Sequence, residues 1–393
     1  MSHGERQYSG SKAYVFVACG SRKHLDTLSY SLEALRHMTQ CRIIVVTDSR
    51  RNEVPISWPD LLNVATPSHF NHHQASIYLK TSLHRILPEG PCYCYLDTDV
   101  LAISPRVDDI FTHKSGPVTF APDLNGLPKF SPYAVRCGCL EQHENDLEEL
   151  KRMLEWKEKK RNQSPTSSPP PVDPSSEGQL KEWGQKLKDL LFRGSRRLKK
   201  VEHLSVDPGE QEAQRYAKWF LDSDKNIWIN PEGREIHTVR CEHLTEQIAS
   251  TFGIHGIDTN WQHWNGGVFL FDSESHAFLD AWHHKTLIIF DNPTWRIRDQ
   301  GTLIATSWEF GLQQSRLLPR EFNFIVDFFT EKTNQMIFDE NGIRNDDCSS
   351  IESAVFIHII HHFGDKTWDT WNWIDKRVNH RILSSTHLVM QLD

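Results

Sequence analysis

Short, continuous apolar runs alternate with segments of helical periodicity over the first hundred residues. The runs at residues 13–19, 42–47 and 92–96 are rich in β-branched and aromatic residues, which is typical of buried strands. Between them, residues 25–38 and 77–86 carry apolar side chains at helical spacing. This alternation predicts an α/β fold with a mostly parallel central sheet and helices on both faces. Ligands of such sheets bind beyond the carboxyl ends of the strands.

Residues 141–250 interrupt this pattern. Residues 141–161 are dense in Glu and Lys and carry leucines at helical spacing, which predicts a charged surface helix. Residues 162–178 are rich in Pro and Ser and predict a disordered linker, because such a segment buries too little apolar area to offset its ordering entropy. We therefore interpret residues 141–250 as a helical, charged insertion.

The globular pattern resumes after the insertion. An apolar run at residues 266–271 predicts a strand, residues 275–285 predict a helix, and residues 354–360 predict a final strand. Residues 11–140 and 251–393 are therefore expected to form the two halves of one domain.

Composition and charge exclude some classes of function. The net charge of -8 gives no basic footprint for nucleic acid, and no apolar run reaches the roughly 18 residues that a membrane span needs. Eight cysteines are too sparse for a disulfide scaffold, which favours a reducing, cytoplasmic location. The close pairs Cys92 with Cys94 and Cys137 with Cys139 have one-residue gaps, so neither pair predicts a zinc knuckle.

Two carboxylates follow the predicted strand at residues 92–96. Asp97 and Asp99 are separated by one residue, so both side chains can face one hard cation. A divalent ion there relieves their repulsion and can neutralise a diphosphate leaving group. An Asp-x-Asp triplet alone also fits a turn at the end of a strand, with no catalytic role.

Three further motifs follow in the chain. The ordered set is Asp97-Thr98-Asp99, Asn265-Gly266-Gly267-Val268-Phe269, Asp299-Gln300-Gly301 and His361-His362-Phe363-Gly364-Asp365-Lys366. In these motifs the chain resembles the family 8 glycosyltransferases of the GT-A fold, which include glycogenin and the bacterial lipopolysaccharide galactosyltransferases. One residue instead of two separates the late Gly364 from Lys366, which departs from the family pattern. The resemblance spans residues 13–135 and 255–370.

The resemblance implies roles for individual residues. Mn²⁺ or Mg²⁺ would be bound by Asp97, Asp99 and a late histidine, where the spacing to Gly364 favours His361 over His362. His358 is expected to be a core residue. Donor binding would involve Lys80, Asp123, Gly364 and Lys366. The sugar and acceptor would be lined by Asn265, Asp299 and Gln300.

These implications lead to one functional expectation and two alternatives. We expect transfer of a hexose from a nucleotide diphosphate sugar, with uridine as the expected base, to a carbohydrate or other hydroxyl acceptor, with retention at the anomeric carbon. The first half of the domain would bind the donor and the second half the acceptor. Residues 96–101 also resemble the nucleophile motif of haloacid-dehalogenase-like phosphatases. A catalytically silent nucleotide-sugar-binding protein is the other alternative.

Overall fold

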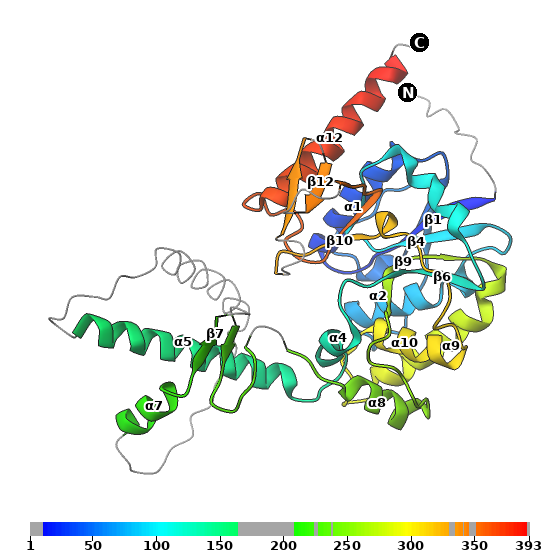
Figure 1. Cartoon of the computed structure of the whole chain (residues 1–393). Coiled ribbons are helices and arrows are strands. Elements are labelled where there is room, and N and C mark those ends of the chain that lie inside the picture. The colour runs from blue at the N-terminus through cyan, green and yellow to red at the C-terminus, as the bar shows by residue number, and fades with distance from the viewer. Residues whose placement is uncertain are drawn as a thin grey trace. The chain divides into compact units, whose positions relative to one another are not determined.

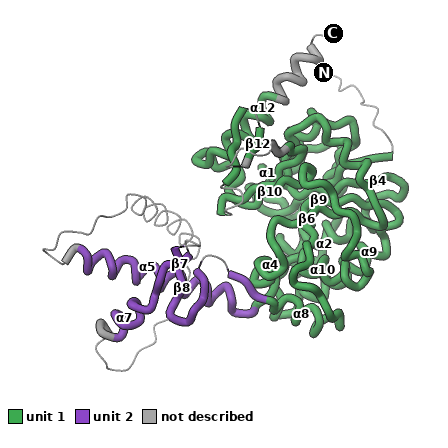
Figure 2. Tube along the Cα trace, viewed as in Figure 1, with its two compact units in different colours: residues 1–136, 242–393 green, residues 137–241 purple. Residues whose placement is uncertain are grey.

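The protein consists of two compact units. The structure is a computed structural model, and it describes residues 11–163, 208–223, 227–236, 239–329, 335–340, 342–345 and 351–390. The larger unit combines residues 1–136 with 242–393, and the smaller unit comprises residues 137–241 (Figure 2). The smaller unit overlaps most of the insertion expected over residues 141–250. Most of the expected linker, residues 164–178, lies outside the described residues.

The larger unit is built on a six-stranded sheet with the order β3-β2-β1-β4-β9-β6 (Figure 1). Its strands are β1 (Lys12–Val17), β2 (Arg42–Thr47), β3 (Leu61–Asn63), β4 (Cys92–Leu96), β6 (Val118–Pro122) and β9 (Trp264–Phe271). Strands β3, β2, β1 and β4 pair in parallel, whereas β9 pairs antiparallel with β4 and β6. The mostly parallel sheet predicted from the alternating pattern is confirmed.

Helices cover both faces of this sheet. The α-helices of the larger unit are α1 (Arg22–Arg36), α2 (His72–Thr81), α3 (Leu83–Ile86), α4 (Leu127–Ala134), α8 (His243–Phe252), α9 (His276–Phe290), α10 (Asp299–Glu309) and α12 (Asp369–Met390). Short 3-10 helices are η1 (Ser49–Arg51), η2 (Pro105–His113), η3 (Ser273–Ser275) and η4 (Arg320–Phe322). Helix α9 continues beyond the expected end at residue 285, because its buried face extends to Phe290.

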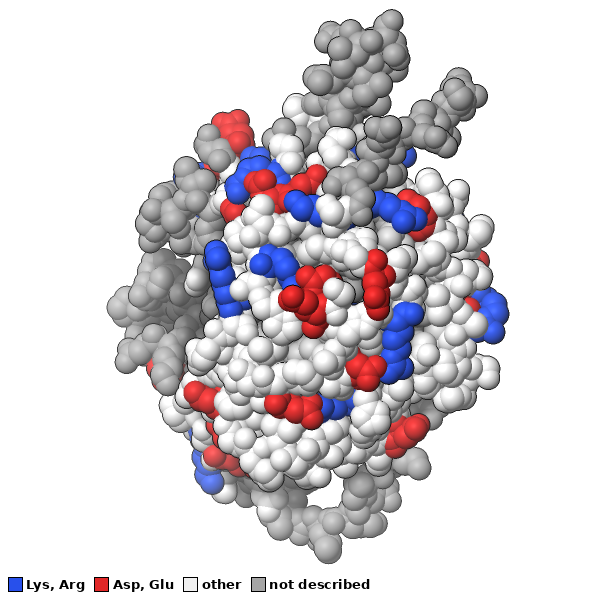
Figure 3. Space-filling view, turned by 90° about the vertical axis from the view of Figure 1, so that its right-hand side faces the viewer, with Lys and Arg blue, Asp and Glu red and all other residues white. Residues whose placement is uncertain are grey.

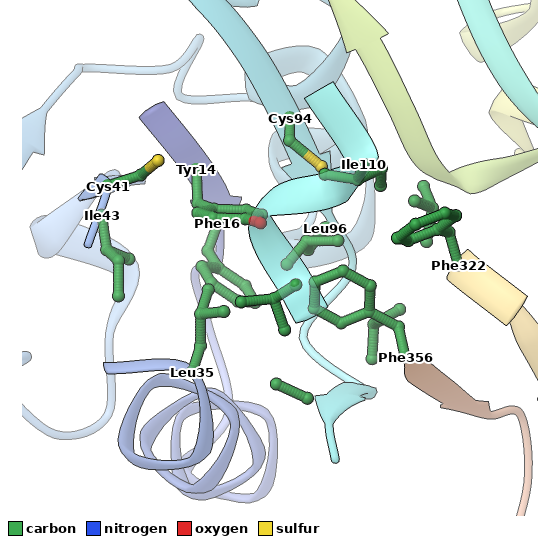
Figure 4. Close-up of a cluster of buried hydrophobic side chains, with 14 of the residues drawn as sticks. Tyr14, Phe16, Leu35, Cys41, Ile43, Cys94, Leu96, Ile110, Phe322 and Phe356 are labelled. Carbon is green, nitrogen blue, oxygen red and sulfur yellow. The ribbon is translucent and has the colours of Figure 1, made fainter. Parts of the chain in front are cut away.

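Two hydrophobic clusters share strand β1. In the first, Leu35 of α1 joins Tyr14 and Phe16 (Figure 4). In the second, Leu79 of α2 joins Val15. Successive side chains of a strand point to opposite faces, so β1 holds a helical layer on each side. The continuous apolar run that predicted a strand is therefore explained by burial on both faces.

A second, three-stranded sheet brings the late part of the chain to the end of β4. It has the order β10-β14-β5, with β5 (Val100–Ala102), β10 (Phe324–Val326) and β14 (Phe356–Ile359). Strand β5 directly follows the Asp-x-Asp segment, and β14 pairs antiparallel with it, so that His358 lies opposite Val100. This pairing places residues that are more than 250 positions apart beside one another. A small antiparallel sheet of β11 (Met336–Asp339), β12 (Gly342–Asn345) and β13 (Ile351–Glu352) is also present.

The smaller unit has its own core. It contains α5 (Cys139–Gln163), α7 (Pro208–Tyr216) and the hairpin of β7 (Phe220–Asp222) and β8 (Ile227–Ile229). Leu147, Leu150 and Met153 of α5 pack against Tyr216 and Trp219. The charged helix expected over residues 141–161 thus has one buried apolar face.

The surface is mixed in charge. On the face shown in Figure 3, basic and acidic side chains are interspersed, and the described residues form no continuous basic surface there. Within the described part of the chain, no helix is long and apolar enough to cross a membrane.

Candidate functional site

Asp97 and Asp99 lie in the short connection between β4 and β5, at the carboxyl end of the parallel strands. The Asp97 backbone N–H donates to the Gly267 carbonyl at 2.8 Å, and the Val100 N–H donates to the Asp97 carbonyl at 3.1 Å. These two bonds fix the turn that carries both carboxylates. Both side chains are half-buried, with about a third of their surface exposed at 31% and 33%.

His358 is the histidine that the structure groups with these aspartates. One ligand atom each from Asp97, Asp99 and His358 lie within 4.8 Å of one another. His358 Nε2 is 3.4 Å from Asp99 Oδ1, and the Ile359 backbone N–H donates to the Asp99 carbonyl at 3.0 Å. The sequence predicted a core histidine here. His358 is buried, but its ring edge faces the carboxylates.

Asn323 orients the His358 ring. Its Oδ1 lies 3.0 Å from His358 Nδ1, and its Nδ2 donates to Asn265 Oδ1 at 3.2 Å. Because the amide oxygen can only accept, Nδ1 carries the proton and Nε2 is directed toward Asp99. The motifs gave no indication of Asn323. It lies just before the buried run of β10, and the spatial pairing of β10 with β14 could not be seen in the sequence.

The late motif contains His361, the expected third metal ligand, and its neighbour His362. Strand β14 ends at Ile359, one residue before the end of the strand predicted over residues 354–360, and His361 lies beyond it. His361 Nδ1 instead lies 2.7 Å from Asp327 Oδ1, and His362 Nδ1 lies 2.6 Å from Asp365 Oδ2. Neither residue belongs to the group formed by the two aspartates and His358.

Lys80 is a buried cation beside the acidic cluster. Its Nζ lies 2.8 Å from Asp299 Oδ2 and 3.3 Å from Asp97 Oδ1. The Tyr95 hydroxyl also donates to Asp97 Oδ1 at 2.5 Å. One oxygen of Asp97 is thus held by Lys80 and Tyr95. Burial acts to lower the pKa of Lys80, but Asp299 and Asp97 raise that pKa above its ordinary value.

Gly267 leaves the space between the ligands. A Cβ atom at this position would lie 2.5 Å from His358 Cε1 and 2.9 Å from both Asp97 Oδ2 and Asn265 Oδ1. The second oxygen of Asp97 and the imidazole therefore approach one another over a residue without a side chain. This close approach explains the glycine in the middle of the buried strand β9.

The electrostatics of the two aspartates differ. Burial raises the pKa of Asp97, and Lys80 opposes this effect. Burial also acts to raise the pKa of Asp99, but the neighbouring His358 lowers it below its ordinary value. The pKa of His358 responds in the opposite sense, because Asp99 outweighs the effect of burial and raises it. Two carboxylates and an imidazole at this spacing form a donor set for a divalent cation.

Asp123, Asn265 and Gln300 form a polar cluster next to this site. Asn265 Nδ2 and Gln300 Nε2 each donate to Asp123 Oδ2 at 2.9 Å. Asn265 Oδ1 in turn accepts from the Gly267 N–H at 2.9 Å, which connects the cluster to the backbone beside Asp97 and His358. The structure thus brings together residues from the loop after β6, from β9 and from the first turn of α10. Asp299 opens α10 and is tied to Lys80.

The late loop is held by its own contacts. Gly364 has φ 81, which favours glycine, and Lys366 is exposed. Hydrogen bonds from Thr367 and then from His362 lower the pKa of Asp365 to about 2. The Lys366 carbonyl accepts from Asn372 Nδ2 at 2.9 Å. The structure shows no contact of the Lys366 ammonium with the group formed by Asp97, Asp99 and His358.

No protein-family model and no curated protein sequence matches the chain. Solved structures with similar features include the galactosyltransferase LgtC in complex with donor and acceptor sugar analogs, with 10% identity, a TM-score of 0.41 and 95% of each chain covered. The bifunctional glycosyltransferase WbbM has 9% identity and a TM-score of 0.45, and the alignment covers 94% of this chain and 50% of WbbM. Mouse xyloside xylosyltransferase 1 has 9% identity and a TM-score of 0.37, covering 88% of this chain and 97% of the mouse chain. At these identities and scores, the case for an activity rests on the site itself.

Proposed function

We propose that the chain is a metal-dependent glycosyltransferase of the GT-A type. It transfers a hexose from a nucleotide diphosphate sugar, with a uridine nucleotide as the preferred donor, to a hydroxyl of a carbohydrate or other acceptor, with retention. The observation that carries the proposal is the grouping of Asp97, Asp99 and His358 within 4.8 Å at the carboxyl end of the parallel strands. Ligands of open α/β sheets bind at this edge.

The donor set suits Mn²⁺ or Mg²⁺. Carboxylate oxygens are ligands of hard cations, and the imidazole of His358 shifts the preference toward Mn²⁺. Asp97, Asp99 and His358 would hold the ion, and Gly267 leaves the room for their approach. When bound, the cation supplies positive charge that neutralises a departing diphosphate. His361 is the competing third ligand on motif grounds, and the affinity measurements below separate the two histidines.

The neighbouring polar residues would recognise the sugar. Asp123, Asn265 and Gln300 present carboxylate and amide groups that can exchange their mutual hydrogen bonds for bonds to sugar hydroxyls. Gln300 and Asp299 would lie near the reacting carbon, with Lys80 holding the orientation of the Asp299 carboxylate. This arrangement fits a reaction in which the protein positions and stabilises charge rather than supplying a reactive thiol or serine.

The late loop would contribute to diphosphate binding. Lys366 is exposed and carries a point charge suited to phosphate, and Gly364 permits the turn before it. Donor binding then orders Lys366 onto the phosphates. Lys80 stays in its ion pairs with Asp97 and Asp299 and shapes the acidic cluster from within.

Donor binding tests the proposal directly. Thermal unfolding is measured with a panel of nucleotide diphosphate sugars and Mn²⁺, because a ligand that binds the native state at 100 times its Kd stabilises it by about 2.7 kcal/mol. Hydrolysis of the stabilising donor is then measured without acceptor. Asp97→Asn and Asp99→Asn should abolish the metal-dependent shift, whereas Asp280→Asn, at an exposed ion pair, should retain it.

Two other outcomes would redirect the assignment. Release of phosphate from an aryl phosphate, with no response to any nucleotide sugar, would favour a phosphatase of the haloacid-dehalogenase type. Metal-dependent donor binding without hydrolysis or transfer would favour a silent binding protein. Full activity in both aspartate variants would contradict the metal site.

A further inference from the structure

Four potential metal ligands outside the site described above gather at the two ends of the insertion. The chain enters the insertion through Cys137-Gly138-Cys139 and leaves it through Cys241-Glu242-His243. One ligand atom from each of Cys137, Cys139, Cys241 and His243 lies within 4.8 Å of the others. The pairs are more than 100 residues apart in sequence, so only the closure of the insertion brings them together.

The spacing of the sulfur atoms matches metal coordination. Cys137 Sγ lies 3.7 Å from Cys241 Sγ. Around a tetrahedral zinc with Zn–S bonds of about 2.3 Å, two sulfur ligands lie about 3.8 Å apart. A disulfide would require about 2.0 Å between the same atoms. The distance between these two sulfur atoms therefore matches the distance between two sulfur ligands in a tetrahedral zinc site.

The backbone turns between Cys137 and Cys139, so that both thiols can face the same site. Gly138 has φ 79, a left-handed conformation that lets the chain turn between Cys137 and Cys139. A Cβ on Gly138 would meet nothing within 4 Å, so the glycine serves the backbone angle and not the packing. Cys139 is the first residue of the 25-residue helix α5, so its thiol is positioned by the start of a regular element.

We propose that Cys137, Cys139, Cys241 and His243 bind a structural Zn²⁺ ion. Three sulfurs and one imidazole are a common ligand set of structural zinc sites, and they complete a tetrahedron with no open position for a substrate. The three cysteines are half-buried and His243 is exposed, which leaves the ion an entry path. The ion closes the 137–241 loop at its base, where a bond between distant residues restricts the unfolded chain most.

The spacing explains why the sequence did not indicate this site. A zinc knuckle has two residues between its cysteines, whereas both halves here have the one-residue form Cys-x-Cys and Cys-x-His. Neither the Cys-x-Cys segment nor the Cys-x-His segment has the spacing of a zinc knuckle by itself. A disulfide between Cys137 and Cys241 is the competing use of the thiols, but it would leave Cys139 and His243 without a role.

Metal analysis of the intact chain tests the proposal. The protein is purified under reducing conditions, washed with EDTA, and analysed for metal by mass spectrometry. We expect one zinc per chain, and loss of most of it in Cys241→Ser and in His243→Ala. His243→Cys should retain the zinc because it preserves four ligands, and Cys92→Ser, outside the cluster, should also retain it.

Cobalt substitution provides a second measurement. Co²⁺ bound by three thiolates should give sulfur-to-cobalt charge-transfer absorption and the intense visible bands of tetrahedral cobalt, both of which Cys139→Ser should weaken. Asp97→Asn with Asp99→Asn should leave zinc content and cobalt spectrum unchanged, which separates this ion from the proposed catalytic metal. The proposal would be overturned if the protein contained no zinc and bound no Co²⁺. It would also be overturned if peptides from freshly prepared, unreduced protein contained a Cys137–Cys241 disulfide.

Discussion

His358 Nε2 lies 3.4 Å from Asp99 Oδ1, where strand β14 pairs with strand β5 from a distant part of the sequence. This contact predicts which histidine binds the metal. His358→Ala should reduce Mn²⁺ affinity by at least about 100-fold. His361→Ala should change it much less, because His361 is held by Asp327. Isothermal titration with Mn²⁺ and the donor nucleotide measures both. A large loss confined to His361→Ala would restore the motif-based assignment.

Asn323 should matter for the metal without touching it. Removal of its hydrogen bond to His358 Nδ1 in Asn323→Ala frees the ring to rotate and to change tautomer. Loss of such a partner typically costs about 10 to 100-fold in metal affinity. Circular dichroism and the unfolding midpoint check that the variant folds. Unchanged Mn²⁺ affinity in a folded Asn323→Ala would show that Asn323 does not position the ligand.

Gly267 and Gly266 offer a matched pair of substitutions. In Gly267→Ala the new methyl group would collide with His358 Cε1 and Asp97 Oδ2, and we expect a loss of about 1 to 3 kcal/mol in stability together with weaker Mn²⁺ binding. Gly266→Ala should be milder, because its nearest neighbour would be Lys80 Nζ at 3.4 Å. Denaturant unfolding and Mn²⁺ titration compare the two. Equal effects would mean that crowding at the ligands is not the cause.

Lys80 should be essential to stability through its buried ion pairs. In Lys80→Met, the carboxylates of Asp97 and Asp299 lose their partner, and removal of one member of a buried pair costs about 3 kcal/mol. The double variant Lys80→Met/Asp299→Asn removes one of the stranded charges and should recover part of the loss. Urea unfolding of the single and double variants measures this coupling. Additive effects would contradict it.

Asp48 should contribute to resistance against acid. Its fully buried carboxylate accepts hydrogen bonds from Arg50 and from Thr66, and these bonds lower its pKa, with those from Arg50 contributing most. A pKa depressed in the folded state stabilises the protein above the unfolded value of about 3.9, and this contribution is lost as the pH falls toward the folded pKa.

Asp48→Asn tests this acid dependence. The variant should be less stable than the original chain at pH 7, and the difference should shrink as the pH falls below about 4. Asp280→Asn, which breaks an exposed ion pair with Arg85, should change stability by less than about 1 kcal/mol. Unfolding midpoints between pH 3 and pH 7 measure both variants. A difference for Asp48→Asn that stays constant with pH would contradict the prediction.

The sequence by itself determined the fold class and the position of the central acidic pair. Short apolar runs rich in β-branched residues, such as residues 43–46, favour strands that are covered on both faces. Their alternation with segments of helical spacing therefore predicted the layered α/β arrangement. The end of one such run also located Asp97 and Asp99 at a strand end, because local hydrophobicity decides where a strand stops. These features depend on residues that are neighbours in the chain.

Tertiary structure alone decided which distant residues meet. The sequence could not distinguish His358 from a core histidine, because its surroundings depend on the pairing of β14 with β5. The contact of His361 with Asp327 is likewise visible only in the structure. Cys137 and Cys139 come close to Cys241 and His243 in the same way, because the two ends of the insertion meet. Pairing across more than a hundred residues leaves no periodic trace in a single sequence, because the register of two strands or loop ends is set by packing throughout the fold.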